Sequence, residues 1–145
     1  MPSASTRDTG PSMRNTICKT VVLPASPAEL YEMYMDPEVH GAFTGAPAKI
    51  SEEAGSAFEA FGGLVKGVTL QAVRHRLVVQ SWRSVNFSKG DPDSLLIVSF
   101  TPEDEDGRID VVHLDVPERG IQDVSGGWES RYFAPWLEYL RSRKP

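Results

Sequence analysis

The sequence has a single cysteine, Cys18, and no long apolar run. One thiol cannot form an intrachain disulfide, which is typical of proteins that fold in a reducing compartment. The longest strongly apolar run covers residues 95–98 and is far too short to span a bilayer. The N-terminus also lacks the apolar core of a secretory signal. These absences predict a cytoplasmic protein with no membrane span.

The sequence also lacks an excess of positive charge and lacks residues spaced as in known metal sites. The chain has 15 Lys and Arg against 20 Asp and Glu, a net charge of −5, so it lacks the cation excess that favours nucleic-acid binding. His40, His75 and His113 have no His, Cys or carboxylate at a known ligand spacing, so we expect no metal site and no cofactor. We also find no nucleophile elbow and no plausible Cys–His pair, so the sequence predicts no catalytic residue.

The chain has the composition of an ordinary soluble globule. Its 145 residues are 40% hydrophobic and 24% charged, which suits one domain. Residues 1–13 are rich in Ser, Thr, Pro and Gly without periodicity, and we expect a disordered arm there. Residues 14–145 are expected to form the single domain.

The strongest periodic pattern lies near the C-terminus. Residues 123–141 predict one amphipathic helix whose apolar face carries residues three and four positions apart, namely Trp128, Tyr132, Pro135, Trp136 and Tyr139. Asp123 or Ser125 is expected to cap its start, and Pro135 is expected to bend it. A face with two Trp and two Tyr needs a broad apolar surface to lie on, and the preceding residues predict a sheet.

The elements before this helix follow a simple order. Residues 15–23 predict a first strand, and Ser26-Pro27-Ala28-Glu29 predicts the start of a short helix. Asp36-Pro37 predicts a second short helix through His40. Further antiparallel strands are expected at 48–50, 56–61, 64–73, 77–84, 95–101 and 108–116. A curved antiparallel sheet covered by a helix often leaves an apolar space between the two, which is a usual site for a small ligand.

The element order resembles the helix-grip fold of the START-like (SRPBCC) superfamily. Several short motifs occur along the chain in a fixed order: Phe61-Gly62-Gly63 with Gly67, residues 75–83, Ser99-Phe100, His113 with Val116-Pro117, and Gly127-Trp128. In these motifs the chain is similar to the C-terminal domain of the activator of heat-shock protein 90 ATPase homologue family, over about residues 16–140. This similarity implies an α+β, birch-pollen-allergen-like fold. In this fold about six to seven antiparallel strands wrap round a long C-terminal helix, and two short helices follow the first strand.

The resemblance also implies a role in the stress response with heat-shock protein 90 as a partner, but two departures weaken that implication. Eukaryotic members carry a separate N-terminal chaperone-binding domain, for which we expect no room in this chain. Asn86-Phe87 stands where many relatives have a Trp-Pro pair. We therefore expect the fold to carry over and chaperone activation to carry over poorly.

Eight residues are expected to line a cavity between sheet and helix: Phe43, Phe58, Trp82, Phe100, His113, Trp128, Tyr132 and Trp136. Trp82 shares a strand face with Gln80 and Ser84, so its ring could line the cavity or, more simply, fill the core. His113 lies on the inner face by strand alternation. It is either a buried neutral histidine with one hydrogen bond or a group that meets a ligand carbonyl or exchanges a proton. Asp115 could orient His113 only if the strand bends. Arg83 points outward.

The leading hypothesis is a non-enzymatic START-like domain that binds a small hydrophobic or amphipathic ligand between sheet and terminal helix. One alternative is a co-chaperone-like protein that interacts with heat-shock protein 90. Another is a cyclase or dehydratase of the polyketide cyclase kind, which would require His113, Asp115 or Tyr132 to face a polar cavity. Both a monomer and a homodimer are compatible with the sequence.

Overall fold

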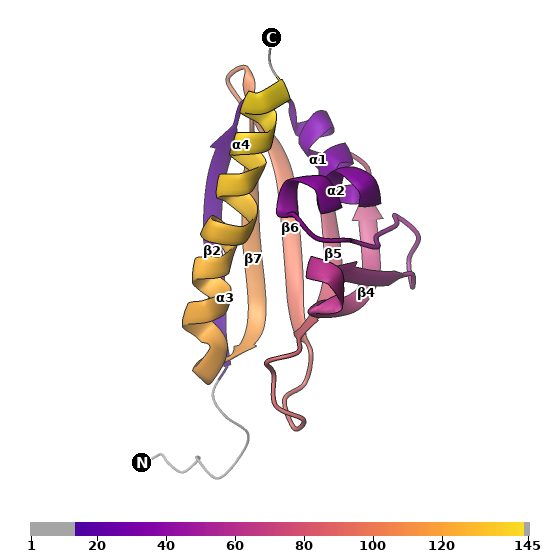
Figure 1. The fold of residues 1–145 in the computed structure, drawn as a ribbon, viewed down its shortest axis with the longest axis vertical. Coiled ribbons are helices and arrows are strands. Elements are labelled where there is room, and N and C mark those ends of the chain that lie inside the picture. Colours follow the sequence, from indigo (N-terminus) through magenta and orange to yellow (C-terminus); the bar gives the residue numbers. More distant parts are fainter. Residues whose placement is uncertain (1–13, 144–145) are drawn as a thin grey trace.

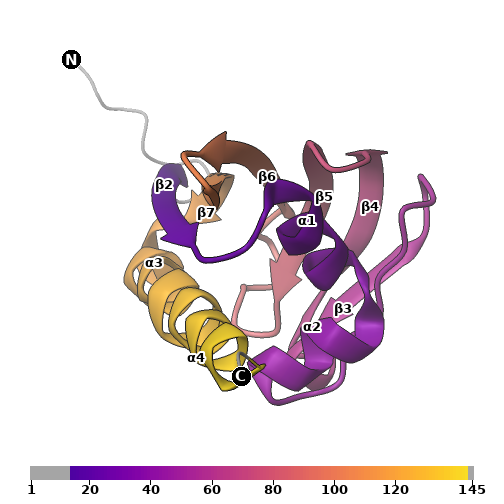
Figure 2. The ribbon, with the colours of Figure 1, turned by 90° about the horizontal axis from the view of Figure 1, so that it is seen from above.

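A computed structural model describes residues 14–143, so the predicted arm lies outside the described residues. Six strands form one antiparallel sheet in the order β2-β7-β6-β5-β4-β3 (Figure 1). The strands are β2 (Arg14–Leu23), β3 (Ala57–Ala60), β4 (Val65–Val73), β5 (Leu77–Ser84), β6 (Ser94–Glu103) and β7 (Asp106–Pro117). Seen from above, the sheet curves around the helices, which lie on its concave side (Figure 2). The predicted α+β, helix-grip arrangement is confirmed.

Two short helices follow β2, as predicted. α1 (Pro27–Met35) starts at Ser26, whose hydroxyl accepts from the Glu29 N–H while the Glu29 carboxylate accepts from the Ser26 N–H. Asp36 caps α2 (Pro37–Thr44) by accepting two backbone N–H bonds. α2 extends four residues beyond His40 because the left-handed residue that ends it is Gly45, with φ 86°.

The terminal helix is continuous from residue 121 to residue 143 but changes pitch. α3 (Ile121–Gly127) leads into a π-helical segment (Trp128–Phe133), and α4 (Ala134–Arg143) completes it. The expected caps were wrong: the helix starts after Gly120 with no side-chain cap, and Asp123 pairs with Arg131 instead. Pro135 lies in the first turn of α4, two residues after the π-helical segment ends, and the bend expected there stays a prediction. None of the described helices is long and apolar enough to cross a membrane.

Strand alternation places the core as predicted. On β5, Val78, Gln80 and Trp82 are buried on the inner face, whereas Arg83 lies on the outer face. The Arg83 guanidinium donates to the carbonyls of Ser88 and Asp91 at 2.7 and 2.6 Å, and so holds the loop after β5. The expected strand at 48–50 is reduced to one bridge between Lys49 and Glu59.

Candidate functional site

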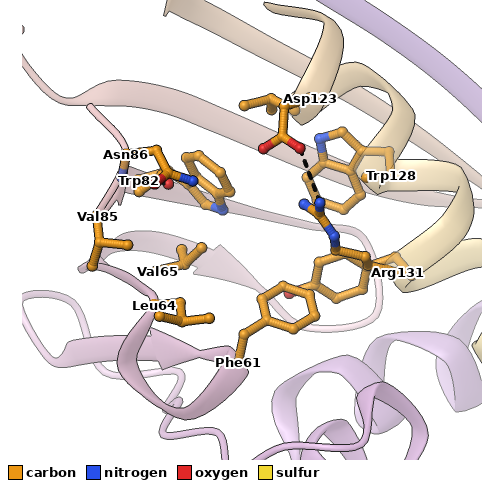
Figure 3. Close-up of a pocket in the computed structure, with 13 residues that line it drawn as sticks. Phe61, Leu64, Val65, Trp82, Val85, Asn86, Asp123, Trp128 and Arg131 are labelled. Carbon is orange, nitrogen blue, oxygen red and sulfur yellow. Dashed lines mark hydrogen bonds and ion pairs between the residues drawn. The ribbon is translucent and has the colours of Figure 1, made fainter. Parts of the chain in front are cut away.

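A pocket of about 380 Å³ lies between the β4–β5 part of the sheet and the first half of the terminal helix (Figure 3). Its volume is near the lower end of the range for small-molecule sites. The lining comes from the turn after β3, from β4, β5 and the following loop, and from the helix: Phe61, Leu64, Val65, Trp82, Ser84, Val85, Asn86, Asp123, Val124, Gly127, Trp128, Arg131 and Tyr132.

Aromatic rings form much of the wall. Trp128 stacks on Tyr132 with centroids 4.7 Å apart, and Phe61 meets Tyr132 edge-on at 5.2 Å. Phe61 reaches this position from a tight turn, Phe61–Gly63, in which three successive residues have positive φ. The turn explains the glycine pair of the motif, because φ values of 67° and 98° suit residues without a side chain.

Trp82 lies at the opposite wall and has an unsatisfied polar atom. The residue is 6% exposed, and its indole nitrogen Nε1 is the only buried side-chain nitrogen or oxygen of residues 14–143 without a hydrogen-bond partner. Figure 3 shows this nitrogen on the side of the ring that faces the space toward Arg131. The ring and that of His113 meet nearly at a right angle, with centroids 4.6 Å apart. The wall of the pocket therefore includes a buried donor that no protein group accepts.

A hydrogen-bonded group behind the pocket fixes His113. The Trp128 Nε1–H donates to His113 Nδ1 at 3.2 Å, and His113 Nε2 lies 2.9 Å from Ser94 Oγ, which donates to the Trp82 carbonyl at 2.6 Å. Because an indole nitrogen only donates, Nδ1 must accept and the proton lies on Nε2. Burial lowers the pKa of His113 to about 3, so the ring is neutral.

The inward position predicted for His113 is confirmed, but both ring nitrogens are bonded to protein groups and His113 does not line the pocket. Asp115 cannot orient it. That residue sits at φ 62° and is exposed, because the strand bulges there rather than bending inward.

A second buried histidine holds Tyr132 in place. His40 Nδ1 donates to the Tyr34 carbonyl at 2.8 Å, so its Nε2 accepts the Tyr132 hydroxyl at 2.9 Å. Burial lowers the pKa of His40 to about 4 and raises the pKa of Tyr132 well above its ordinary value. Tyr34 in turn donates to Gln80 at 2.8 Å. Sequence reasoning gave His40 no role, since its partner lies 92 residues away.

The mouth of the pocket combines charge with apolar surface. Arg131 donates to Asp123 at 2.9 Å, and both side chains are about half exposed. The guanidinium lies close against the helix, because a Cβ at Gly127 would be 2.9 Å from Arg131 Nη1. Leu64 and Val85 are 58% and 61% exposed and form an apolar rim. Arg131 lies off the apolar positions of the helix pattern, so its place at the pocket was not predicted from the sequence.

Three of the eight residues predicted to line a cavity, Trp82, Trp128 and Tyr132, line this pocket. The other five are buried elsewhere in the core: Phe43, Phe58, Phe100, His113 and Trp136. Phe43, for example, stacks on Trp136 with centroids 4.5 Å apart, because α2 packs against α4. Ligand contact by any of the eight stays a prediction. Within residues 14–143, no group of three or more His, Cys, Asp or Glu is arranged to hold a metal ion.

Comparison with known proteins gives a consistent family match. The family model described as Activator of Hsp90 ATPase homolog 1-like protein matches residues 24–134. A Dictyostelium discoideum relative, "Activator of 90 kDa heat shock protein ATPase homolog", is 26% identical over 105 residues, which are 72% of this chain and 27% of the relative. The Homo sapiens "Activator of 90 kDa heat shock protein ATPase homolog 1" is 25% identical over 123 residues, 85% of this chain and 36% of that protein. The matched region is therefore a minor part of both relatives.

Solved structures share the fold. The crystal structure of an Hsp90 activator from Plasmodium falciparum superposes with a TM-score of 0.75 at 16% identity. The superposition covers 88% of this chain and 96% of the other.

Proposed function

This chain belongs to the Activator of Hsp90 ATPase homolog 1-like protein family, and we propose that it binds a small hydrophobic or amphipathic molecule in the pocket between sheet and terminal helix. The observation that carries the proposal is the 380 Å³ pocket with aromatic walls. A well-formed apolar pocket with a few converging polar groups is the usual form of a small-molecule site.

The distribution of polar groups supports an amphipathic ligand. Aromatic rings of Phe61, Trp82 and Trp128 surround the inner space, whereas Arg131 and Asp123 stand at the mouth. An apolar body would be desolvated inside, and a polar or charged group would remain near the ion pair and water.

The buried polar groups support binding rather than catalysis. A cyclase or dehydratase would need a titratable group that faces the ligand, and His113 is bonded to Ser94 and Trp128 behind the wall. Tyr132 lines the pocket, but its hydroxyl donates to His40. Asp115 is exposed on a bulge outside the pocket. We therefore propose no reaction for this site.

The test uses two tryptophan substitutions in the loop after β5. Asn86 is exposed and lines the mouth, so Asn86→Trp should plug the pocket, whereas Lys89→Trp places the same ring on the same loop outside the lining. Native mass spectrometry of freshly purified protein should reveal a retained small molecule. Titration with 1-anilinonaphthalene-8-sulfonate should give one saturable site in the wild type and Lys89→Trp, and much weaker binding in Asn86→Trp. Equal binding by all three proteins would contradict the proposal.

Contact with a 90 kDa heat-shock protein is a second candidate, favoured by the names of the family and of the curated relatives. The chain matches only 27% and 36% of those relatives, so it offers one module's contacts. A single module lacks the avidity of linked modules, so we expect weak stimulation of the chaperone ATPase. Stimulation as strong as that by a full-length relative at equal concentration would contradict this expectation.

A further inference from the structure

We propose that the ligand carries a neutral oxygen acceptor at its buried end and that this oxygen accepts a hydrogen bond from the Trp82 Nε1–H. The inference rests on the proposed function and specifies its ligand. It starts from the one buried side-chain polar atom of residues 14–143 that has no partner, which belongs to a residue lining the pocket. Buried donors in folded proteins are nearly always paired, so an exception beside a cavity points to a partner that enters the cavity.

The other two indoles provide the contrast. Trp128 Nε1–H donates to His113 at 3.2 Å, and Trp136 Nε1–H donates to the Met33 sulfur at 3.5 Å. Both donors face protein, and both are satisfied within the chain. Trp82 is as deeply buried as Trp128, at 6% against 4% exposure, yet its nitrogen faces the pocket. The lack of a partner is therefore a property of the pocket and not of tryptophan burial in this fold.

The Trp82 nitrogen is buried and has no partner among the protein groups. A ligand oxygen that comes within hydrogen-bond distance of it supplies the missing acceptor, whereas a purely apolar ligand leaves the indole unpaired. The pocket therefore discriminates in favour of a ligand with an acceptor at the inner end. An indole N–H cannot accept, so a ligand that places a donor there gains nothing.

The acceptor should be neutral. A carboxylate taken into an aromatic pocket loses its hydration and needs a cation nearby, which one indole N–H does not replace. The lining cation, Arg131, is half exposed at the mouth and already paired with Asp123 at 2.9 Å. His113, whose ring contacts that of Trp82, is neutral because burial lowers its pKa. The inner end therefore suits a ketone, lactone, ester or amide oxygen, and any charge on the ligand belongs at the mouth.

The shape of the wall narrows the class further. Trp128 and Tyr132 both line the pocket and stack on each other with an interplanar angle of 23°. Aromatic rings associate with such rings through offset stacks or edge-on contacts. The class that fits is a planar ring compound with a carbonyl oxygen on its leading edge.

The probes are 9-fluorenone and fluorene, which share a flat skeleton and differ by a carbonyl against a methylene. Dissociation constants of both are measured for the wild type, Trp82→Phe and Trp136→Phe. Trp82→Phe removes the N–H and keeps an aromatic ring. Trp136→Phe is the matched control, because it removes the same group from an indole that is 1% exposed and outside the pocket lining.

The preference for fluorenone, expressed as the ratio of the two constants, should fall by roughly 2- to 12-fold in Trp82→Phe, as one neutral hydrogen bond predicts. Trp136→Phe should keep the wild-type ratio. Proton–nitrogen spectra of the wild type should show the Trp82 indole resonance shifting with fluorenone much more than with fluorene. This measurement uses only the wild-type protein, so it does not require that a variant fold.

If the ratio is unchanged in Trp82→Phe, or if fluorenone does not shift the Trp82 indole resonance, the inference is wrong. Binding of both probes would in that case still support the pocket as a binding site. Tighter binding of fluorene-9-carboxylate than of fluorenone would overturn the neutral acceptor. If neither probe binds but 1-anilinonaphthalene-8-sulfonate does, the inference fails and the proposed function stands. If no probe binds, both fail.

Discussion

The space between sheet and terminal helix has two ends that are built from the same kinds of residue and differ in outcome. At one end α1 and α2 pack between sheet and helix, and Trp136 is 1% exposed, stacked on Phe43 and bonded to Met33 (Figure 1). At the other end Trp82 and Trp128 face each other across a 380 Å³ pocket, and the Trp82 nitrogen is unpaired. Aromatic composition alone does not make a binding site. Whether aromatic rings border a pocket depends on whether other elements of the fold, here α1 and α2, pack against them.

The largest expected effect is at the packed end. Trp136→Ala should lower the free energy of unfolding by about 3–5 kcal/mol, because it opens a cavity in a region where α2 and α4 are in contact. Urea denaturation followed by far-UV circular dichroism measures the change. If Trp136→Ala lowers the free energy of unfolding by less than Trp82→Ala does, the end of the space near Trp136 is not the more tightly packed of the two.

Acidification should affect both ends. The folded-state pKa values of His40 and His113, about 4 and about 3, lie below the ordinary 6.5 because the rings are buried. Below pH 6.5 the unfolded chain therefore binds protons that the folded chain does not, and stability falls as pH decreases. From pH 7 to pH 5 we expect a loss on the order of 4 kcal/mol from the two groups together.

Denaturation curves at pH 7, 6 and 5 for the wild type, His40→Gln and His113→Gln test this and compare the ends. Each substitution should remove about half of the pH dependence. If water reaches His113, the pKa of His113 lies nearer its ordinary value. In that case His113→Gln leaves the pH dependence of the free energy of unfolding unchanged, whereas His40→Gln reduces it.

A smaller effect is expected at the pocket wall. Trp82→Ala should lower the free energy of unfolding by about 1–3 kcal/mol, less than Trp136→Ala, because it enlarges a void that already exists and removes no hydrogen-bonded donor. The same denaturation assay applies. Equal losses at Trp82 and Trp136 would indicate that the two ends are packed alike.

The smallest expected effect is at the mouth. Gly127→Ala should change stability by less than about 1 kcal/mol, since the helix favours Ala and only the flexible end of Arg131 must move. The displaced guanidinium should nevertheless alter binding of 1-anilinonaphthalene-8-sulfonate. Gly126→Ala is the control, because a Cβ there meets nothing within 4 Å. Identical affinities in the two variants would remove Arg131 from the site.

Those features of the fold that depend on near neighbours were predictable from the sequence. Ser26 and Asp36 cap helices through hydrogen bonds to residues two or three positions away. Successive residues of β5 point to opposite faces of the sheet, and this alternation places Trp82 on the inner face. Such hydrogen bonds and such periodicity depend only on residues that are close together in the sequence. They specified the six strands of the sheet, the two short helices and the terminal helix, and so the helix-grip architecture.

The site was decided only in three dimensions. His40 meets Tyr132 across 92 residues, and Trp128 reaches His113 from another element. A strand or helix pattern shows that Trp136 and Trp82 both point inward, but not that α2 covers one while the other borders an open space. That difference arises because a pocket is the volume which the folded elements leave unfilled, and no local stretch of sequence contains it.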